Sequence, residues 1–228
     1  MPYLPGQRIV DAIFRAPKLR HEIPLTLTSR LVGLRVDAIA RRGKYLLFDC
    51  ESARGGGWLI LHLGMSGSLR LVSHGTPPQK HDHVDLVFAH TALRFRDPRR
   101  FGTLLWHEGS DIERHPLIAV LGIEPLSDEF DGDWLYAETR RRSVPIKPLL
   151  MDSHLVVGIG NIYASESLFR AGISPLRAAN RISRERYRIL VPAIRATLET
   201  SITAGGSSVR DYVHSDGGAG CFQLSCAV

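Results

Sequence analysis

The fold is decided by a short stretch that reads Val156-Val157-Gly158-Ile159-Gly160-Asn161-Ile162-Tyr163-Ala164-Ser165-Glu166-Ser167. Gly158 and Gly160 flank one apolar residue, and Asn161 precedes a run of helix formers that extends to Ala171. Asparagine is a strong N-cap and glycine lets the backbone approach another group, so we expect a tight turn followed by a capped helix. The free N–H groups and the positive dipole end of such a helix form an anion site. An ordinary capped helix after a glycine turn is the alternative.

The charge balance of the chain favours an anionic partner. Its 228 residues include 29 Lys and Arg against 23 Asp and Glu, which gives a formal net charge of +6. Because a basic chain suits a phosphate-rich partner, the anion expected at the glycine turn is a nucleic-acid phosphate. The hydrophobic content of 44% argues for a folded protein, and the length allows two domains.

Several classes of protein are disfavoured by features that the sequence lacks. No apolar run reaches the length of a membrane span and no signal-peptide layout opens the chain, so we expect a cytoplasmic, nucleoid-associated protein. The cysteines Cys50, Cys221 and Cys226 form no Cys-x-x-Cys pair, which argues against a disulfide framework or a complete zinc site. His81 and His83 have the spacing to share one face of a strand, but no third ligand stands nearby, and we predict no metal site.

The first half of the chain has the texture of short strands. Alternating or short apolar runs, separated by glycines and prolines, lie at Arg35–Ala40, Tyr45–Phe48, Trp58–Leu63, His83–Phe88 and Leu93–Arg96. This even spacing predicts an antiparallel β-sandwich or barrel. We place this domain at residues 1–125.

After Pro125 the texture becomes helical, so we predict an α+β fold with a second, helical domain at residues 133–214. Ser183 is placed to cap a helix whose apolar face is formed by Tyr187, Leu190, Val191, Ile194, Leu198 and Ile202. Pro192 predicts a kink or break in that helix, and Gly205-Gly206 predicts its end. The acidic segment Leu126–Asp133 is expected to be the linker between the domains.

The basic residues fall into three clusters. Arg94, Arg96, Arg99 and Arg100 surround Asp97-Pro98, Arg140-Arg141-Arg142 precedes Lys147, and Arg41-Arg42-Gly43-Lys44 precedes a predicted strand. A single cluster of this kind is most often a solvated face. Three clusters interleaved with glycine and aromatic residues favour contact with nucleic acid.

Five motifs resemble, in the same order, those of the formamidopyrimidine-DNA glycosylases, which belong to the formamidopyrimidine/endonuclease VIII family. They are Leu63–Arg70, Lys80–Asp85, Asp97–Gly102, Ile146–Pro148 and Gly158–Ser167. The resemblance implies a β-sandwich followed by a helix–two-turns–helix domain, with damaged double-stranded DNA in the cleft between them. It also implies base-excision repair by a monomeric, bifunctional glycosylase and AP lyase that removes 8-oxoguanine and formamidopyrimidines and then nicks the strand.

The resemblance assigns roles to residues that match the family's motifs. Lys44 matches the strand lysine that assists proton transfer during β-elimination, and its neighbours Arg41 and Arg42 give it a reason to lose a proton more easily. Met65, Arg99 and Phe101 match the trio that enters the gap left by a flipped nucleotide. The DNA-contacting positions are matched by His81, Arg99, Arg142, Lys147 and Asn161.

The N-terminal residues depart from the family pattern. The family starts with a proline whose secondary amine attacks the sugar, followed by a glutamate that shuttles protons; this chain reads Met1-Pro2-Tyr3. Tyrosine, with a pKa near ~10, is a poor substitute for a carboxylate. We favour a second alignment, in which Pro2–Ile9 resembles the end of the family's first helix and the following strand, and the nucleophile and that helix lie outside the sequence. This alignment predicts that the catalytic amine is lost or impaired.

The C-terminal residues also stop short of the family pattern. Residues 215–228 resemble a remnant of the lesion-covering loop, and the four cysteines of the family's zinc finger are absent. Complete members carry one zinc, whereas we expect no cofactor in this chain. Two further functions stay open: a non-catalytic remnant that binds damaged DNA, and an RNA- or ribosome-associated module.

Overall fold

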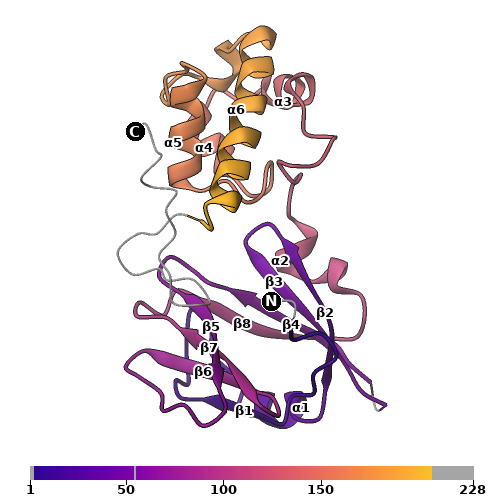
Figure 1. Ribbon diagram of the computed structural model, residues 1–228. Helices are drawn as coiled ribbons and strands as arrows, with labels where there is room; N and C mark the ends of the chain where they lie inside the picture. Colours follow the sequence, from indigo (N-terminus) through magenta and orange to yellow (C-terminus); the bar gives the residue numbers. More distant parts are fainter. Residues whose placement is uncertain (1–2, 54, 207–228) are drawn as a thin grey trace. The chain divides into compact units, whose positions relative to one another are not determined.

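The alternating apolar residues of the first half form strands, as their spacing predicts (Figure 1). The computed structural model describes residues 3–53 and 55–206. Within them lie β1 (Asp11–Phe14), β2 (Arg35–Arg42), β3 (Tyr45–Glu51), β4 (Gly57–His62), β5 (Ser68–Ser73), β6 (Asp82–Val87), β7 (Thr91–Arg96) and β8 (Thr103–Glu108). Pro2, Cys221, Cys226 and the predicted loop remnant at 215–228 lie outside the described residues.

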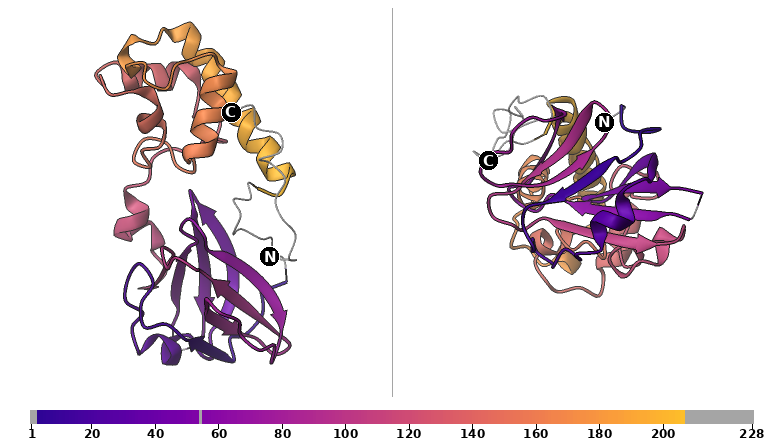
Figure 2. Two further views of the ribbon diagram at one scale, coloured as in Figure 1. Left: turned by 90° about the vertical axis from the view of Figure 1, so that its left-hand side faces the viewer. Right: turned by 90° about the horizontal axis from the view of Figure 1, so that it is seen from below.

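The eight strands form two four-stranded antiparallel sheets, so the predicted sandwich is confirmed (Figure 2). One sheet has the order β2-β3-β4-β8 and the other has the order β1-β6-β7-β5. Their apolar side chains bury a common core, and its largest members include Phe48, Phe88 and Phe95. A short helix, α1 (Leu27–Leu31), places Leu27 and Leu31 in this core.

Residues 3–10, the described part of the chain before β1, belong to the sandwich and form no helix. Leu4 and Ile9 are buried in the core, and the amide of Gly6 donates a 2.7 Å hydrogen bond to the carbonyl of Val36 in β2. Arg8 forms an isolated bridge with Arg35 at the start of β2. This segment is therefore held along the edge of the first sheet.

The second half of the described chain is helical. Its helices are α3 (Gly132–Thr139), α4 (Ile146–Leu150), α5 (Asn161–Arg170) and α6 (Arg184–Thr203), with a 3₁₀ turn at Ala179–Arg181. A second core lies among them, with Tyr187, Leu190 and Ile194 of α6 fully buried. A 3₁₀ turn at Ile112–Arg114 and the short helix α2 (Pro116–Ala119) precede this unit.

Helix α6 follows its predicted pattern with two differences. The hydroxyl of Ser183 accepts a hydrogen bond from the amide of Arg186 and caps the helix, and Gly205 and Gly206 take positive φ angles at its end. Pro192 lies inside an unbroken helix, because the apolar side chains on both sides of it are held in the core. Ile202 is 67% exposed, since it lies in the last turn, beyond the residues that form the core.

The segment Leu126–Asp133, which we predicted to be a linker, is part of the helical unit. Phe130 is fully buried in the second core, and Arg195 of α6 donates hydrogen bonds to the carbonyls of Ser127 and Phe130. Asp131 caps α3 by accepting a 2.7 Å hydrogen bond from the amide of Trp134. Contacts between residues divide the two units between Ile118 and Ala119, earlier than the predicted limit at residue 125.

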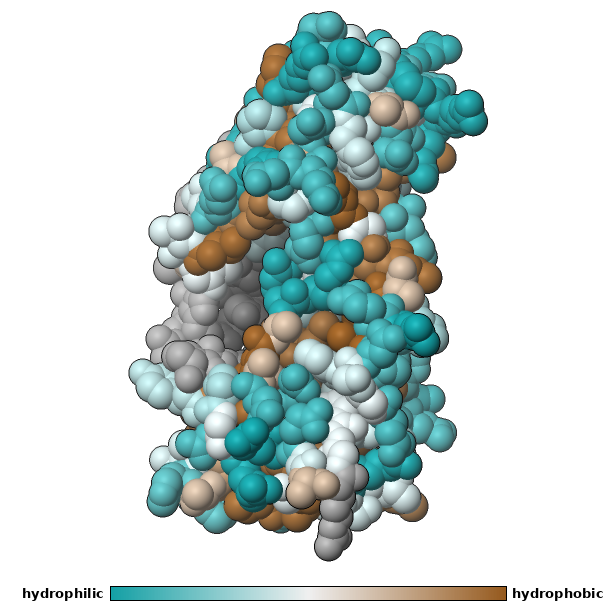
Figure 3. Space-filling view, turned by 90° about the vertical axis from the view of Figure 1, so that its right-hand side faces the viewer, coloured by the Kyte–Doolittle hydropathy of each residue, from teal (hydrophilic) through white to brown (hydrophobic). Residues whose placement is uncertain are grey.

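Hydrophilic residues cover most of the face of each unit that Figure 3 displays, with apolar residues in smaller patches. In the described part of the chain, no helix combines the length and the apolar character needed to cross a membrane.

Candidate nucleic-acid interface

One buried carboxylate organises the loops at an end of the sandwich. Asp97, which follows β7, has no exposed surface. Its Oδ1 accepts a 2.8 Å hydrogen bond from the hydroxyl of Ser66, and its Oδ2 accepts a 2.7 Å bond from the amide of Gly102. Its backbone carbonyl lies 2.9 Å from Nε2 of His83, and its amide donates to the carbonyl of His81. Asp97 thus joins the β4–β5 loop, the start of β6 and the β7–β8 loop.

Gly64 allows the β4–β5 loop to touch the backbone of the β7–β8 loop, and Gly102 allows the β7–β8 loop to pack on the ring of Phe95. A Cβ on Gly64 would lie 2.6 Å from the carbonyl carbon of Phe101, and a Cβ on Gly102 would lie 2.5 Å from the ring of Phe95. Neither position has room for a side chain, because real Cβ atoms do not approach so closely. Gly64 also has a φ of +71°, which glycine adopts without strain.

Exposed apolar side chains protrude from these two loops. Met65 is 70% exposed and Phe101 is 43% exposed, although both stand beside buried residues. The guanidinium of Arg99 lies 4.5 Å from the centre of the Phe101 ring, a cation–π arrangement. The structure therefore brings together the two loops that carry the predicted trio.

The backbone around the trio holds an unusual conformation. His81, directly before β6, has a φ of +75°, and Arg100, between two members of the trio, has a φ of +55°. In the described chain these two are the only residues other than glycine with a positive φ. Such conformations are found where the surrounding structure imposes them, often at functional sites.

Lys44 lies in the two-residue turn between β2 and β3. Gly43, with a φ of +57°, takes the first position of this turn, as in a type II′ hairpin. Much of the surface of Lys44 is exposed. Protein atoms around its ammonium group nevertheless displace part of the surrounding water, and this desolvation lowers its pKa. The direction agrees with the sequence-based expectation, but the cause is burial rather than the charge of Arg41 and Arg42.

His62, at the end of β4, is a neighbour of Lys44 that the sequence analysis missed. The amide of Gly64 donates a 3.0 Å hydrogen bond to its Nδ1, so the ring proton is carried by Nε2. Burial first, and then the charges of Lys44 and Arg20, lower the pKa of His62 and favour its neutral form. Its ring also contacts Tyr45, with centroids 5.0 Å apart. The available signal was its position directly before the Leu63–Arg70 motif.

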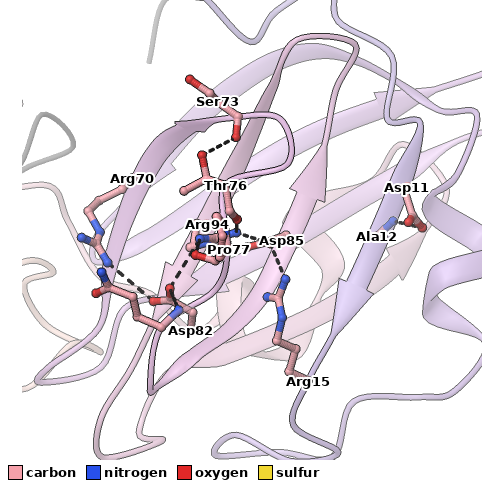
Figure 4. Close-up of polar contacts among 11 residues, drawn as sticks. Asp11, Ala12, Arg15, Arg70, Ser73, Thr76, Pro77, Asp82, Asp85 and Arg94 are labelled. Atoms are coloured by element: carbon pink, nitrogen blue, oxygen red, sulfur yellow. Dashed lines mark hydrogen bonds and ion pairs between the residues drawn. The ribbon is translucent and has the colours of Figure 1, made fainter.

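Arg94, which the sequence groups with Arg99, is turned into the protein (Figure 4). Its guanidinium donates two hydrogen bonds of 2.8 Å to Asp85, which also pairs with Arg15 at 2.6 Å. Asp82 lies 3.6 Å from Arg94 and 3.5 Å from Arg70. Burial acts to raise the pKa of Asp85, but its hydrogen bonds to Arg94 and Arg15 outweigh burial and lower it. Arg94 is therefore a structural residue.

The arginine run of the helical unit divides in the same way. Arg140 donates hydrogen bonds to the carbonyls of Tyr136, Ala179, Asn180 and Ile182, and its guanidinium lies 3.8 Å from the centre of the Tyr136 ring. Arg142 is exposed, and Lys147 in α4 is partly exposed. The two latter residues are available to a ligand, whereas Arg140 holds the segment 179–182 against α3.

The start of α5 differs by one residue from the prediction. Gly160, not Asn161, occupies the N-cap position, and no side chain caps the helix. Gly160 can take the extended cap conformation (φ −106°, ψ −177°), so the helical backbone already begins at Asn161. The exposed Asn161 side chain and the positive dipole end of α5 are thus presented together, after the turn at Gly158 with its φ of +82°.

The described residues contain no group of three or more His, Cys, Asp or Glu side chains that suits a metal ion. Cys50 is buried in β3, and its burial raises the pKa of the thiol to about 12. A thiol that stays protonated is a poor zinc ligand, so Cys50 is not a candidate for zinc binding.

Comparisons with known proteins match both units. The model of the formamidopyrimidine-DNA glycosylase N-terminal domain matches residues 1–104, and that of the formamidopyrimidine-DNA glycosylase H2TH domain matches residues 121–213. The chain is 66% identical over 229 residues to the formamidopyrimidine-DNA glycosylase of Dechloromonas aromatica (strain RCB), covering 100% of this chain and 83% of that protein. It is 51% identical to the enzyme of the same name from Ralstonia pickettii (strain 12J), covering 100% of this chain and 84% of that protein.

Solved structures agree with these matches. A Lactococcus lactis FPG mutant in complex with a Fapy-dG containing DNA superposes with a TM-score of 0.88 at 32% identity, covering 99% of this chain and 82% of that chain. The MutM (FPG) protein from Thermus thermophilus superposes with a TM-score of 0.84 at 38% identity, covering 100% of this chain and 81% of that chain.

Proposed function

The chain belongs to the formamidopyrimidine-DNA glycosylase family of base-excision repair enzymes, and from this premise we propose that it excises oxidised purines from damaged duplex DNA and then nicks the abasic strand. The substrates we propose are 8-oxoguanine and formamidopyrimidines. The similarity to proteins solved with Fapy-dG DNA and with abasic-site DNA supports this choice.

The observation that carries the proposal is the exposure of Met65 and Phe101 on loops fixed by a buried carboxylate. A flipped nucleotide leaves an unstacked gap and an orphan base in the duplex. Apolar and aromatic side chains refill such a gap, and the guanidinium of Arg99, stacked on Phe101, can donate hydrogen bonds to the orphan base. These loops lose little entropy when they enter the duplex, because Asp97 already fixes them.

The phosphates of the damaged strand would be held by exposed donors. In the helical unit these are Arg142, Lys147 and the Asn161 end of α5, where the helix dipole favours an anion. In the sandwich the proposed donor is His81. Its backbone carbonyl accepts a hydrogen bond from the amide of Asp97, which joins it to the loop of Arg99. All of these contacts are independent of base sequence, which suits an enzyme that must inspect any duplex.

Lys44 is the residue that we assign to proton transfer in strand nicking. Its lowered pKa leaves a larger fraction of the amine neutral, and a neutral amine can accept the proton that elimination releases. Burial and the charge of Lys44 lower the pKa of His62, so the neutral ring is favoured and a second positive charge beside Lys44 is disfavoured. The attacking amine of the family is an N-terminal proline, and Pro2 lies outside the described residues.

The proposed substrate sets the location, since genomic DNA in a bacterium lies in the nucleoid. We therefore infer a cytoplasmic, nucleoid-associated monomer.

Borohydride trapping tests the proposal directly. The chain is mixed with duplex that carries 8-oxoguanine or an abasic site, reduced, and examined for a covalent protein–DNA band. A covalent band would support the proposal, and its loss in Pro2→Gly would identify Pro2 as the attacking amine, against the alignment that places the family's amine elsewhere. We expect Lys44→Ala to keep the band while slowing strand nicking. Absence of any band, with lesion duplex still retained in a gel shift, would instead support a non-catalytic protein that binds damage.

A further inference from the structure

A cavity in the helical unit has no part in the proposed reaction. It lies in the connection between α5 and α6, has a volume of about 400 Å³, and is lined by Gly172, Ile173, Ser174, Arg177, Arg181, Ile182, Ser183 and Arg186. Asn161 stands at the other end of α5, ten residues and therefore ~15 Å away along the helix. The cavity is thus separate from the end of α5 that we assign to the damaged strand.

The walls of the cavity are fixed by hydrogen bonds of the arginines themselves. Arg186 donates a 2.5 Å hydrogen bond to the carbonyl of Gly172, which fastens the first turn of α6 to the end of α5. Arg177 donates to the carbonyl of Arg181 across the connecting segment. The buried side chains of Ile173 and Ile182 form an apolar floor. Each guanidinium has five donors, so most remain available to a ligand.

The charge of the cavity is of one sign. Arg177, Arg181 and Arg186 are exposed, no carboxylate is among the lining residues, and in the described chain none of the three forms an ion pair. The nearest acid in sequence, Glu185, is not a lining residue; hydrogen bonds from its own backbone amide and from the Ser183 side chain, and then the charges of Arg188 and Arg184, lower its pKa. Those two arginines are themselves paired with Asp133. Three unpaired arginines around a concavity attract an anion with several oxygens.

We propose that this arginine cavity binds a phosphate of a DNA backbone other than the one held at the lesion, giving the helical unit a second DNA contact. The proposal rests on the proposed function only in taking DNA as the source of the phosphate. Planar guanidinium groups bind phosphate oxygens in pairs. A second contact allows the protein to hold one duplex segment while it engages another.

The test uses amide NMR signals of Gly172, Ser174 and Ser183 in the full chain, titrated separately with inorganic pyrophosphate and with lesion-free duplex. We expect both ligands to shift these signals. Arg177→Gln with Arg181→Gln should weaken both shifts, by roughly tenfold in affinity for each arginine that contacts phosphate. The control, Arg184→Gln with Arg188→Gln, removes the same charge from the neighbouring surface and should leave both titrations unchanged.

Two results would overturn the proposal. One is an absence of shifts at these amides with duplex, whether or not pyrophosphate shifts them, and the other is equal weakening by the control variant. Borohydride trapping of the Arg177→Gln/Arg181→Gln variant is measured alongside, and we expect the wild-type yield. A normal trapping yield without the amide shifts would reject the second DNA contact and leave the proposed glycosylase function standing. Amide shifts without trapping would reject the glycosylase function and leave the second DNA contact standing.

Discussion

The hydroxyl of Ser66 donates a 2.8 Å hydrogen bond to the carboxylate of Asp97, and both residues are buried. This bond joins the loop of Met65 to the loop of Phe101. Fixed loops of this kind present apolar side chains to the outside without collapsing onto the core.

The first prediction concerns this bond. Ser66→Ala leaves an oxygen of the buried carboxylate without its donor, and we expect a loss of about 1–3 kcal/mol in the free energy of unfolding. Urea denaturation measures it. Ser29→Ala, which removes an exposed hydroxyl bonded to a turn carbonyl, is the control and should cost about 0.5 kcal/mol or less. Equal losses in the two variants would show that the buried hydrogen bond contributes no more to the free energy of unfolding than an exposed one.

The second prediction separates stability from excision. Met65→Ala and Phe101→Ala remove exposed side chains, so the free energy of unfolding should change by about 0.5 kcal/mol or less. Excision of 8-oxoguanine should slow roughly tenfold to a hundredfold, because refilling the stack offsets a few kcal/mol of unstacking. Leu25→Ala removes an apolar side chain that is 98% exposed elsewhere on the sandwich, and it should leave the rate unchanged. Normal excision by both loop variants would reject the gap-filling role.

The third prediction contrasts two arginines of one run. Arg140→Ala leaves several carbonyls without their charged donor, and we expect the helical unit to lose about 3 kcal/mol of stability. Arg142→Ala should keep the fold and lower the slope of DNA affinity against salt by about one phosphate contact. Thermal unfolding and salt-dependent gel shifts measure the two effects. A loss of stability in Arg142→Ala together with a lower salt slope in Arg140→Ala would show that Arg142 is the structural residue and Arg140 the phosphate contact.

The fourth prediction concerns pH. Burial lowers the pKa of Lys44 below the usual 10.5, so the neutral amine gains population at a lower pH than in a free lysine. The rate of strand nicking on a preformed abasic duplex should therefore rise with pH and level off before pH 10.5. Lys44→Arg should remove this rise, because arginine stays protonated across the range. A variant with the wild-type pH profile would assign the rise to another group.

The fifth prediction concerns acid stability. The pKa of Asp85 lies below 3.8, so the stabilisation by its arginine partners is present above that value and is lost as the pH falls through the folded-state pKa. Asp85→Asn should cost about 3 kcal/mol at pH ~7, since Arg94 loses its main partner. The difference from wild type should shrink at acid pH. A constant difference down to the acid transition would contradict the assignment.

The sandwich was predictable because each strand carries its own local signal. Apolar alternation and the glycines between strands act over a few residues, and they located β2, β3, β4, β6 and β7. The start of α5 was misjudged by one residue because Asn161 and Gly160 are both acceptable caps, and only backbone geometry decides between them.

The charged residues could not be sorted from the sequence. Arg94 and Arg99 belong to one cluster, yet the first is buried against Asp85 and the second is exposed over Phe101. Likewise, the carbonyls that bind Arg140 lie about forty residues away, at 179–182. Burial of a charge depends on such distant partners, and no local pattern records them. His62 was missed for the same reason, because its importance comes from Lys44 in the adjacent hairpin.

The left-handed backbone at His81 and Arg100 has a consequence for how the protein searches DNA. Each such residue costs about 1 kcal/mol or more, and this cost is met once, when the chain folds. If the loop of Arg99 and Phe101 enters the duplex as we propose, it is already held in its working shape and needs no rearrangement at each base pair. The resistance that the loop meets at a base pair then comes only from the stacking of that pair. A stiff loop therefore distinguishes a damaged pair by its weaker stacking.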